Sequence, residues 1–113
     1  MRYEHEGKIA VLYSPGYGAG WSSWNQDHAE ILMMHPVLVE PVHQFEQGLI
    51  TKEQMKEKIV FGLAMLGLDD LYNTNGSINL TICWLDPGQR FLIKEYDGSE
   101  SVVLFEQQEW LTA

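Results

Sequence analysis

A short apolar run that breaks into a loop rich in glycine and tryptophan is the feature that most restricts how this chain can fold. Residues 9–13 read Ile-Ala-Val-Leu-Tyr, which is the length of a strand, and a Ser-Pro pair ends the run. Glycine lets the backbone adopt positive φ and lets other groups approach the main chain. Tryptophan offers a large flat surface with one N–H donor. The loop contains three glycines at alternate positions and then two tryptophans: Gly16, Gly18, Gly20, Trp21 and Trp24.

The spacing of these glycines differs from that of a dinucleotide-binding fingerprint. Such a fingerprint reads Gly-x-Gly-x-x-Gly, and Trp21 occupies the position of its third glycine. A chain of 113 residues is also too short for the dinucleotide fold with its acidic ribose contact. Two interpretations of the loop remain. In the first, its backbone amides and an aromatic side chain contact a phosphate or a ring of a ligand. In the second, its tryptophans pack into the core. We expect one tryptophan in each role and take four residues as ligand-binding candidates: Gly18, Gly20, Trp21 and Trp24.

The segment after the loop predicts helical structure. Asn25 is a favoured N-cap residue, and a helix from there is expected to run to about Met34. Residues 37–46 are ambiguous, because their β-branched residues favour a strand whereas Pro41 opposes a central one. We interpret residues 37–46 as short helical turns.

The clearest helix signal lies in residues 51–66. Thr51 and Gln54 match a capping box, in which each side chain bonds the backbone N–H of the other residue. Gly67 is the natural residue to end the helix in the left-handed conformation. Apolar residues follow helical spacing on one face and charged residues occupy the other: Met55, Ile59, Gly62, Leu63 and Leu66 against Lys52, Glu53, Lys56 and Glu57.

Three strand-like runs fill the last third of the chain, at residues 78–85, 90–96 and 101–105. The second and third are separated by Asp-Gly, which is a strong hairpin signal, and the first and second by a turn with Pro-Gly. We therefore predict an α+β fold with a single small domain, residues 1–113. Its antiparallel sheet combines the N-terminal strand with a C-terminal three-stranded meander, and two or three helices cover one face.

Composition limits the classes of function. Seven basic and sixteen acidic residues give a formal net charge of −9, which opposes binding to a nucleic-acid polymer but leaves room for an acidic mimic of one. The single cysteine, Cys83, lies in an apolar run, so we expect a small buried side chain in a reducing compartment. The N-terminus is too polar for a signal peptide, and no apolar run is long enough to cross a membrane. We expect a cytosolic protein with no membrane partner.

Residue types that serve catalysis are present without a recognised pattern. The histidines at positions 5, 28, 35 and 43 lack the spacing of a zinc site. Ser22 or Ser23 with His28 lacks the elbow and the third member of a nucleophile triad. Three acids lie near the predicted hairpin turn: Glu95, Asp97 and Glu100. A paired-carboxylate hydrolase uses acids of this kind, yet the acids of a turn rich in them are usually only solvated. We expect no enzyme, no metal and no cofactor.

Basic residues are few, so their positions carry information. Arg90, Lys94 and Tyr96 share one face of residues 90–96 by the two-residue period of a strand. This face suits an anionic ligand, with Arg90 as the bidentate partner of a phosphate and Lys94 as a second positive charge. The alternative is that both side chains face solvent or pair with Glu95 and Glu100.

Two stretches of the chain carry a resemblance. Residues 18–25 read Gly-Ala-Gly-Trp-Ser-Ser-Trp-Asn, and residues 91–101 read Phe-Leu-Ile-Lys-Glu-Tyr-Asp-Gly-Ser-Glu-Ser. Together they resemble a family of small proteins encoded by tailed phages and prophages, and are similar to the phage Thoeris anti-defence sponges. The resemblance covers a little under half the chain. It implies a viral protein of the host cell cytoplasm that forms homo-oligomers. Such proteins bind cyclic ADP-ribose isomers, the signals of bacterial TIR-domain immune proteins, and sequester them without degrading them.

The resemblance also implies which residues form the site. The basic pair Arg90 and Lys94 is expected to bind the ligand together with Asn73 from the preceding polar loop, and Phe61 of the predicted helix is expected to stack on the base. Lysine at position 94 departs from an arginine phosphate clamp. The rival hypothesis is an acidic interaction protein that inhibits a host defence factor by direct binding. Its support is the net charge and a set of acids expected at the surface: Glu95, Asp97, Glu100, Glu106 and Glu109.

Overall fold

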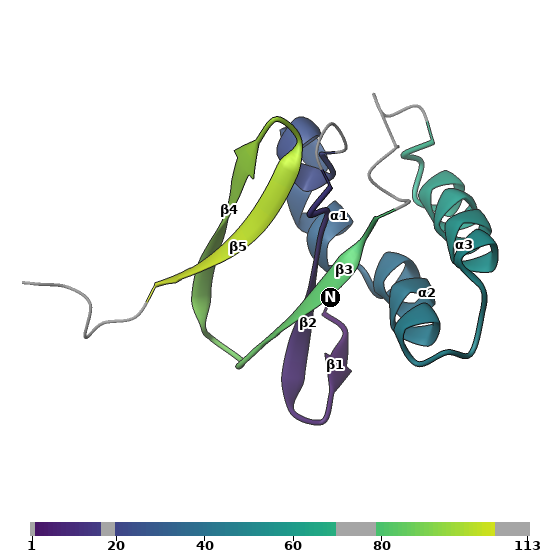
Figure 1. Cartoon of the computed structure of the whole chain (residues 1–113), viewed down its shortest axis with the longest axis horizontal. Coiled ribbons are helices and arrows are strands. Elements are labelled where there is room, and N and C mark those ends of the chain that lie inside the picture. The colour runs from purple at the N-terminus through teal and green to yellow at the C-terminus, as the bar shows by residue number, and fades with distance from the viewer. Residues whose placement is uncertain (1, 17–19, 70–78, 106–113) are drawn as a thin grey trace, which may run out of the picture.

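The fold is α+β with antiparallel strands, as predicted, and the strands form two separate sheets. The computed structural model describes residues 2–16, 20–69 and 79–105. A three-stranded sheet has the order β1-β2-β3, and β4 and β5 form a hairpin of their own (Figure 1). The elements in chain order are β1 (Glu4–His5), β2 (Lys8–Tyr13), the 3-10 turns η1 (Ser22–Trp24) and η2 (Gln26–His28), α1 (Ala29–Met34), α2 (Pro36–Glu46), α3 (Lys52–Met65), β3 (Thr81–Leu85), β4 (Arg90–Tyr96) and β5 (Ser99–Phe105).

The predicted C-terminal meander is wrong at its first turn. β3 pairs with β2, in the register Ile9 with Leu85, and not with β4. The turn at residues 86–89, in which Gly88 has a φ of +82°, sends the chain out of the sheet. β4 and β5 then fold over the second face of that sheet, where β2 has apolar side chains to cover. The hairpin turn at Asp97-Gly98 is confirmed, because β4 and β5 pair on either side of it.

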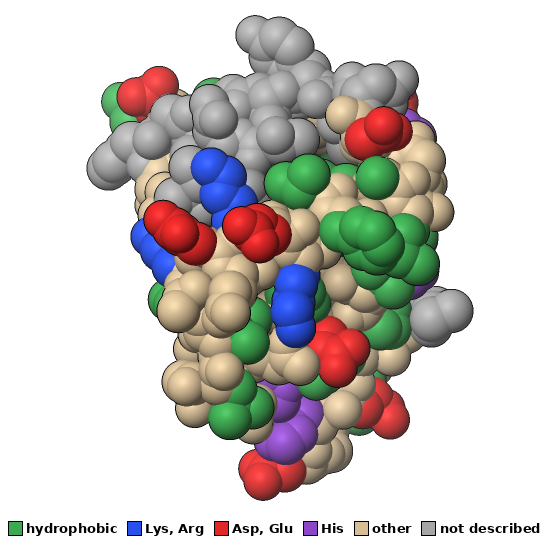
Figure 2. All heavy atoms as spheres, turned by 90° about the vertical axis from the view of Figure 1, so that its right-hand side faces the viewer, with side chains coloured by type: hydrophobic (Ala, Val, Ile, Leu, Met, Phe, Trp, Pro, Cys, Tyr) green, Lys and Arg blue, Asp and Glu red, His purple; other side chains and the backbone are tan. Residues whose placement is uncertain are grey.

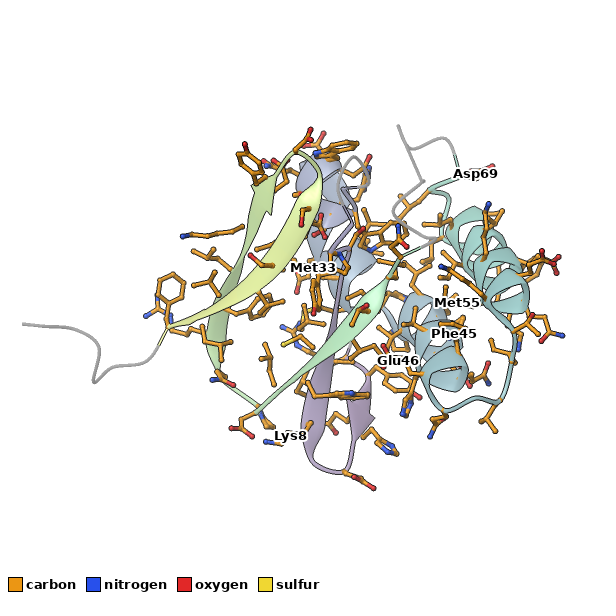
Figure 3. All side chains as sticks on the ribbon, viewed as in Figure 1. Lys8, Met33, Phe45, Glu46, Met55 and Asp69 are labelled. Atoms are coloured by element: carbon orange, nitrogen blue, oxygen red, sulfur yellow. The ribbon has the colours of Figure 1, made fainter. Side chains whose placement is uncertain are left out.

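The strand predicted from the apolar run at residues 9–13 is confirmed as β2, and its alternate side chains fill two cores. Ala10 and Leu12 face the helices, where they join a buried cluster with residues of α2 and α3. Ile9 and Val11 face the hairpin. Figure 3 labels Met33 of α1, which packs against this second core, and Phe45 of α2 and Met55 of α3, which belong to the first. A nearly continuous apolar strand is what such a two-sided environment requires.

The helix predicted from residue 51 is confirmed in detail as α3. The Thr51 hydroxyl accepts from the Gln54 N–H at 3.1 Å, and the side-chain Oε1 atom of Gln54 accepts from the Thr51 N–H at 2.9 Å. At the other end Gly67 has a φ of +73°, and the N–H of Leu68 donates to the carbonyl of Leu63 at 2.8 Å. This bond and the left-handed conformation of Gly67 are those of a Schellman motif, which gives a partner to a carbonyl that the helix end would leave free.

The segment between the loop and α3 differs from the prediction. Residues 36–46 form one helix, α2, instead of short turns, because Pro36 occupies its first position and the His35 ring accepts from the Val37 N–H at 3.1 Å. Asn25 does not cap a helix: its side-chain amide donates to the Trp21 carbonyl at 3.0 Å, and α1 begins only at Ala29. Within the described residues, no helix combines the length and the apolar character that crossing a membrane requires.

Candidate functional site

The outer face of the β4–β5 hairpin brings part of the predicted site together. Lys94 and Tyr96 line an open hollow of about 420 Å³ with Glu95 and two serines that the sequence did not single out, Ser99 and Ser101. β5 presents Ser101 opposite Lys94 and Ser99 opposite Tyr96, so cross-strand pairing assembles the group. Tyr96 is 78% exposed. The hollow therefore offers an ammonium, hydroxyl groups and an aromatic ring to the solvent, together with the carboxylate of Glu95.

Arg90 lies on the same face but does not reach the hollow. As expected, the exposure of the side chains alternates along β4: Arg90, Leu92 and Lys94 are exposed, and the residues between them are half-buried. The Arg90 guanidinium lies 5.8 Å from the centre of the Phe105 ring, which is a cation–π distance. Four residues of extended chain separate Arg90 from Lys94 by about 13 Å. As the structure places them, Arg90 lies over the Phe105 ring and Lys94 lines the hollow, so the two side chains do not meet at one point.

The glycine and tryptophan loop is organised around Glu100, which corrects the prediction that this acid is exposed. Glu100 is the second residue of β5 and is 2% exposed. One carboxylate oxygen accepts from the Ser14 N–H at 2.9 Å. The other accepts from the N–H of Trp21 at 2.7 Å and from both the N–H and the hydroxyl of Ser23, at 3.0 and 2.5 Å. Three backbone N–H groups in the described part of this loop, those of Ser14, Trp21 and Ser23, thus bind a carboxylate of the chain itself.

Trp21 is a core residue. It is 1% exposed, and its indole N–H donates to the Leu32 carbonyl at 2.7 Å. Trp24 is half-buried in η1 and covers Gly20, where an added Cβ would lie 2.6 Å from the indole ring. Gly20 is itself buried. Among the described residues of the loop, the glycine at position 20 makes room for a tryptophan of the same loop.

Phe61 belongs to α3, and α3 lies on the opposite side of the three-stranded sheet from the hairpin (Figure 1). It is 67% exposed on α3 and borders a hollow of about 510 Å³ between α2 and α3. Within one chain it does not meet Lys94 or Tyr96. Gly18 and Asn73, the other predicted ligand residues, lie outside the described residues, as do Glu106 and Glu109.

The remaining acids at the hairpin turn serve the turn itself. A carboxylate oxygen of Glu95 accepts from the Gly98 N–H at 2.7 Å, and Asp97 has a φ of +50°. Ser23, considered above as a nucleophile with His28, donates its hydroxyl to Glu100. The residues that the structure describes contain no group of three or more potential metal ligands.

The sequence missed a cluster of rings between β1, α2 and β3. The Tyr3 hydroxyl and the Nδ1 atom of His43 are 2.9 Å apart, and the rings of His5 and His43 have centroids 4.5 Å apart. Trp84 packs against all three. Burial, and then the negative charge of Glu40, raise the pKa of Tyr3 above its usual value. Only the pairing of β1 with β2 brings residues 3 and 5 to residue 43, so spacing along the chain held no signal.

A larger hollow, of about 630 Å³, lies where the second core opens between α1 and the turn at residues 86–89. Its lining is mostly apolar, and its charged side chains are those of Arg2, Glu4, Glu30 and Asp86. Arg2 and Glu30 form an ion pair at 3.7 Å, and Asp86 is paired with Lys8. Three of the four charged side chains are thus already paired within the chain, and we assign no ligand to this hollow.

Comparisons with known proteins add no assignment. Neither the family models, nor the curated proteins, nor the solved structures contain a match to this chain.

Proposed function

We propose that this protein binds a small phosphorylated ligand of nucleotide type and leaves it chemically unchanged. The observation that supports this is the hollow on the hairpin, where Lys94 and Tyr96 lie beside two serine hydroxyls. Ammonium and hydroxyl groups suit phosphate oxygens, and an exposed phenol ring suits stacking on a base. On a chain of net charge −9, an exposed lysine beside hydroxyl groups provides a local site for an anion.

The resemblance of residues 18–25 and 91–101 narrows the ligand class. It points to cyclic ADP-ribose isomers, and so to a phage anti-defence protein that sequesters an immune signal in the host cytoplasm. The elements that carry Phe61 and Lys94, α3 and β4, lie on opposite sides of the three-stranded sheet in one chain. A pocket that includes both residues therefore needs two copies, which agrees with the homo-oligomer that the resemblance implies.

The test is calorimetric titration of the purified protein with cyclic ADP-ribose isomers, linear ADP-ribose and inorganic phosphate. We expect heat on titration with the cyclic nucleotides, and recovery of the same compounds by mass spectrometry after the protein is denatured. Lys94→Ala is expected to weaken binding at least tenfold, because it removes the ammonium from the hollow. Lys56→Ala, which changes an exposed lysine on α3, is the matched control and is expected to bind as the native protein does.

Two results would contradict the proposal. One is the absence of heat with every nucleotide. The other is turnover of the ligand to a product, which would make the protein an enzyme.

The rival hypothesis, inhibition of a host factor through an acidic surface, keeps only part of its support. Glu95 and Asp97 are exposed at the hairpin turn, but Glu100 is buried. The two hypotheses differ in one measurement. An acidic inhibitor forms a stable complex with a purified host protein, and the Glu95→Gln, Asp97→Asn double variant weakens that complex, whereas the ligand-binding proposal expects no such complex.

A further inference from the structure

The outer face of the β4–β5 hairpin extends well beyond the hollow near its turn. Phe91, Ile93 and Leu104 pack inward against the second core, so the residues that alternate with them face away from the sheet (Figure 1). The register pairs these outward residues across the two strands, from the open end of the hairpin to its turn: Arg90 with Phe105, Leu92 with Val103, Lys94 with Ser101 and Tyr96 with Ser99. The hollow occupies only the last two of these pairs.

This face is positively charged although the chain is acidic. Arg90 and Lys94 are both exposed, and within the described residues neither side chain takes part in an ion pair. The four outward pairs include no acidic residue. Of the acids elsewhere in the hairpin, Glu100 is buried against the loop, and Glu95 and Asp97 lie at the turn end. The Arg90 end of the face is the one farther from both exposed acids.

The other basic residues stand close to acids. The three lysines of α3, at positions 52, 56 and 58, share that helix with Glu53 and Glu57. Figure 2, which views the helix side of the molecule, shows lysine and acidic side chains next to one another. The remaining two basic residues form the ion pairs with Glu30 and Asp86 described above. Charge complementarity therefore favours an anionic ligand on the outer face of the hairpin.

Arg90 and Phe105 form a second group of the same chemical kind as the hollow. The guanidinium lies 5.8 Å from the centre of the Phe105 ring, and both side chains are exposed. A guanidinium that rests on an aromatic ring keeps its in-plane N–H donors for a phosphate. Each end of the face thus combines one cation with one aromatic ring, Arg90 with Phe105 and Lys94 with Tyr96.

The spacing of the two groups suits an extended ligand. Arg90 and Lys94 lie about 13 Å apart along β4, and the face measures about 20 Å from Arg90 to Tyr96. Leu92 and Val103 form an apolar stretch between the cations. A compact nucleotide fills the hollow alone, whereas a single strand of nucleic acid presents phosphates and bases along its length. Proteins that bind single strands use cations along the backbone and aromatic rings under the bases.

We infer that Arg90 and Phe105 form a second subsite, and that the outer face of the hairpin binds a short single strand of nucleic acid. Phosphates lie at Arg90 and Lys94, and bases stack on Phe105 and Tyr96. The inference rests on the proposed function for the hollow and extends it to a longer ligand. The net charge of −9 repels the rest of a long polymer, so the contact is limited to the few nucleotides on this face.

The test is calorimetric titration of the full chain with adenosine monophosphate, a diadenylate, a tetra-adenylate and a cyclic ADP-ribose isomer. We expect the native protein to bind the tetra-adenylate at least tenfold more tightly than the monophosphate, because the longer strand adds a phosphate at Arg90 and a stacked base at Phe105. Arg90→Ala is expected to remove most of this gain and to leave the affinity for the monophosphate and the cyclic compound within twofold. It is also expected to reduce the salt slope of tetra-adenylate binding by about 0.7.

Two variants complete the design. Lys94→Ala is expected to weaken the binding of all four compounds, since it changes the hollow itself. Lys56→Ala, which removes an exposed lysine on α3, is the matched control and is expected to keep the full gain with length. Circular dichroism of each variant separates lost binding from lost fold.

The results that overturn the inference differ from those that contradict the proposed function. A native protein that binds the monophosphate or the cyclic compound but gains no affinity with length rejects the second subsite alone. The same holds if Arg90→Ala keeps the gain, or if Lys56→Ala loses as much of it as Arg90→Ala does. A protein that binds none of the four compounds rejects the proposed function as well.

Discussion

At the scale of single residues, Glu100 joins two parts of the chain that are far apart in sequence. Its carboxylate holds the backbone of Ser14, Trp21 and Ser23, and its own N–H donates to the Ser14 carbonyl at 2.7 Å. A buried carboxylate that accepts several hydrogen bonds is costly to disturb, because each lost bond leaves a buried donor without a partner. The loop and the hairpin are therefore expected to lose stability together.

Glu100→Gln tests this role. The variant keeps the shape of the side chain but turns an NH₂ group toward amide donors, so we expect the free energy of unfolding to fall by about 3 kcal/mol. Urea denaturation measures the change. Glu95→Gln, which affects one hydrogen bond at the exposed turn, is expected to cost about 1 kcal/mol or less. Equal losses for the two variants would show that Glu100 has no special role.

Gly20 makes a second prediction at the same scale. Gly20→Ala is expected to destabilise the protein by about 1–3 kcal/mol, because the new Cβ would overlap the Trp24 ring. The same substitution in a Trp24→Ala background is expected to cost much less, since the overlapping ring is gone. A double-mutant cycle measures the difference. Equal costs in both backgrounds would mean that the glycine is needed for another reason.

At the scale of elements, local residues specify both ends of α3, so its bounds could be predicted from the sequence. Its capping box, its two-sided apolar pattern and the Schellman motif at Gly67 all depend on residues within or next to the helix. The pairing of β3 has the opposite character. β3 has an apolar pattern that suits either neighbour, and the contacts with β2 and α2 decide between them, including the Ile82 N–H that donates to the Glu46 carboxylate at 3.2 Å.

The cap of α3 gives a prediction with a known scale. Thr51→Ala removes the hydroxyl that accepts from the Gln54 N–H, and we expect a loss of about 1 kcal/mol in the free energy of unfolding. Lys52→Ala, one residue further on and exposed, is the control and is expected to change it by less than about 0.5 kcal/mol. Thermal unfolding followed by circular dichroism measures both variants. A neutral Thr51→Ala would show that the helix does not depend on its cap.

At the scale of the whole molecule, the two cores share the β2–β3 sheet, and each contains an ionisable group whose environment changes on folding. Burial raises the pKa of the Cys83 thiol, which contacts the second core. Burial and the charge of Glu40 raise the pKa of Tyr3, which contacts the first. Both groups are neutral when protonated, so the folded state holds these protons more tightly than the unfolded chain does.

These shifts predict a loss of stability at alkaline pH. A raised pKa in the folded state contributes stability below the unfolded value, and that contribution is lost as the pH rises through the folded value. We expect the contribution to be constant from neutral pH to about the ordinary pKa of a thiol, 9.0, and to fall above it, with Tyr3 adding its loss above 10.0. Urea denaturation in buffers of increasing pH measures the slope.

Cys83→Ala combined with Tyr3→Phe is the control for this slope. The double variant removes both titrating groups, so its stability is expected to be lower at neutral pH but to depend less on pH in the alkaline range. An unchanged slope would mean that other groups account for the alkaline loss.

The sequence by itself determined the parts of this protein whose causes are local: β2 with its two apolar faces, α3 with its caps, the hairpin turn at Asp97-Gly98, and the alternation that exposes Lys94 and Tyr96. Periodicity and turn chemistry act over a few residues, so a single sequence contains them.

Only the tertiary structure decided which strand β3 pairs with, that Glu100 is buried against the loop, that Trp21 lies in the core, and that His5 meets His43. Each of these depends on contacts between residues far apart in the chain. The loop rich in glycine and tryptophan has amides that suit a ligand phosphate, but a carboxylate 79 residues beyond Trp21 occupies them. Local chemistry identified the donors, and the fold determined their partner.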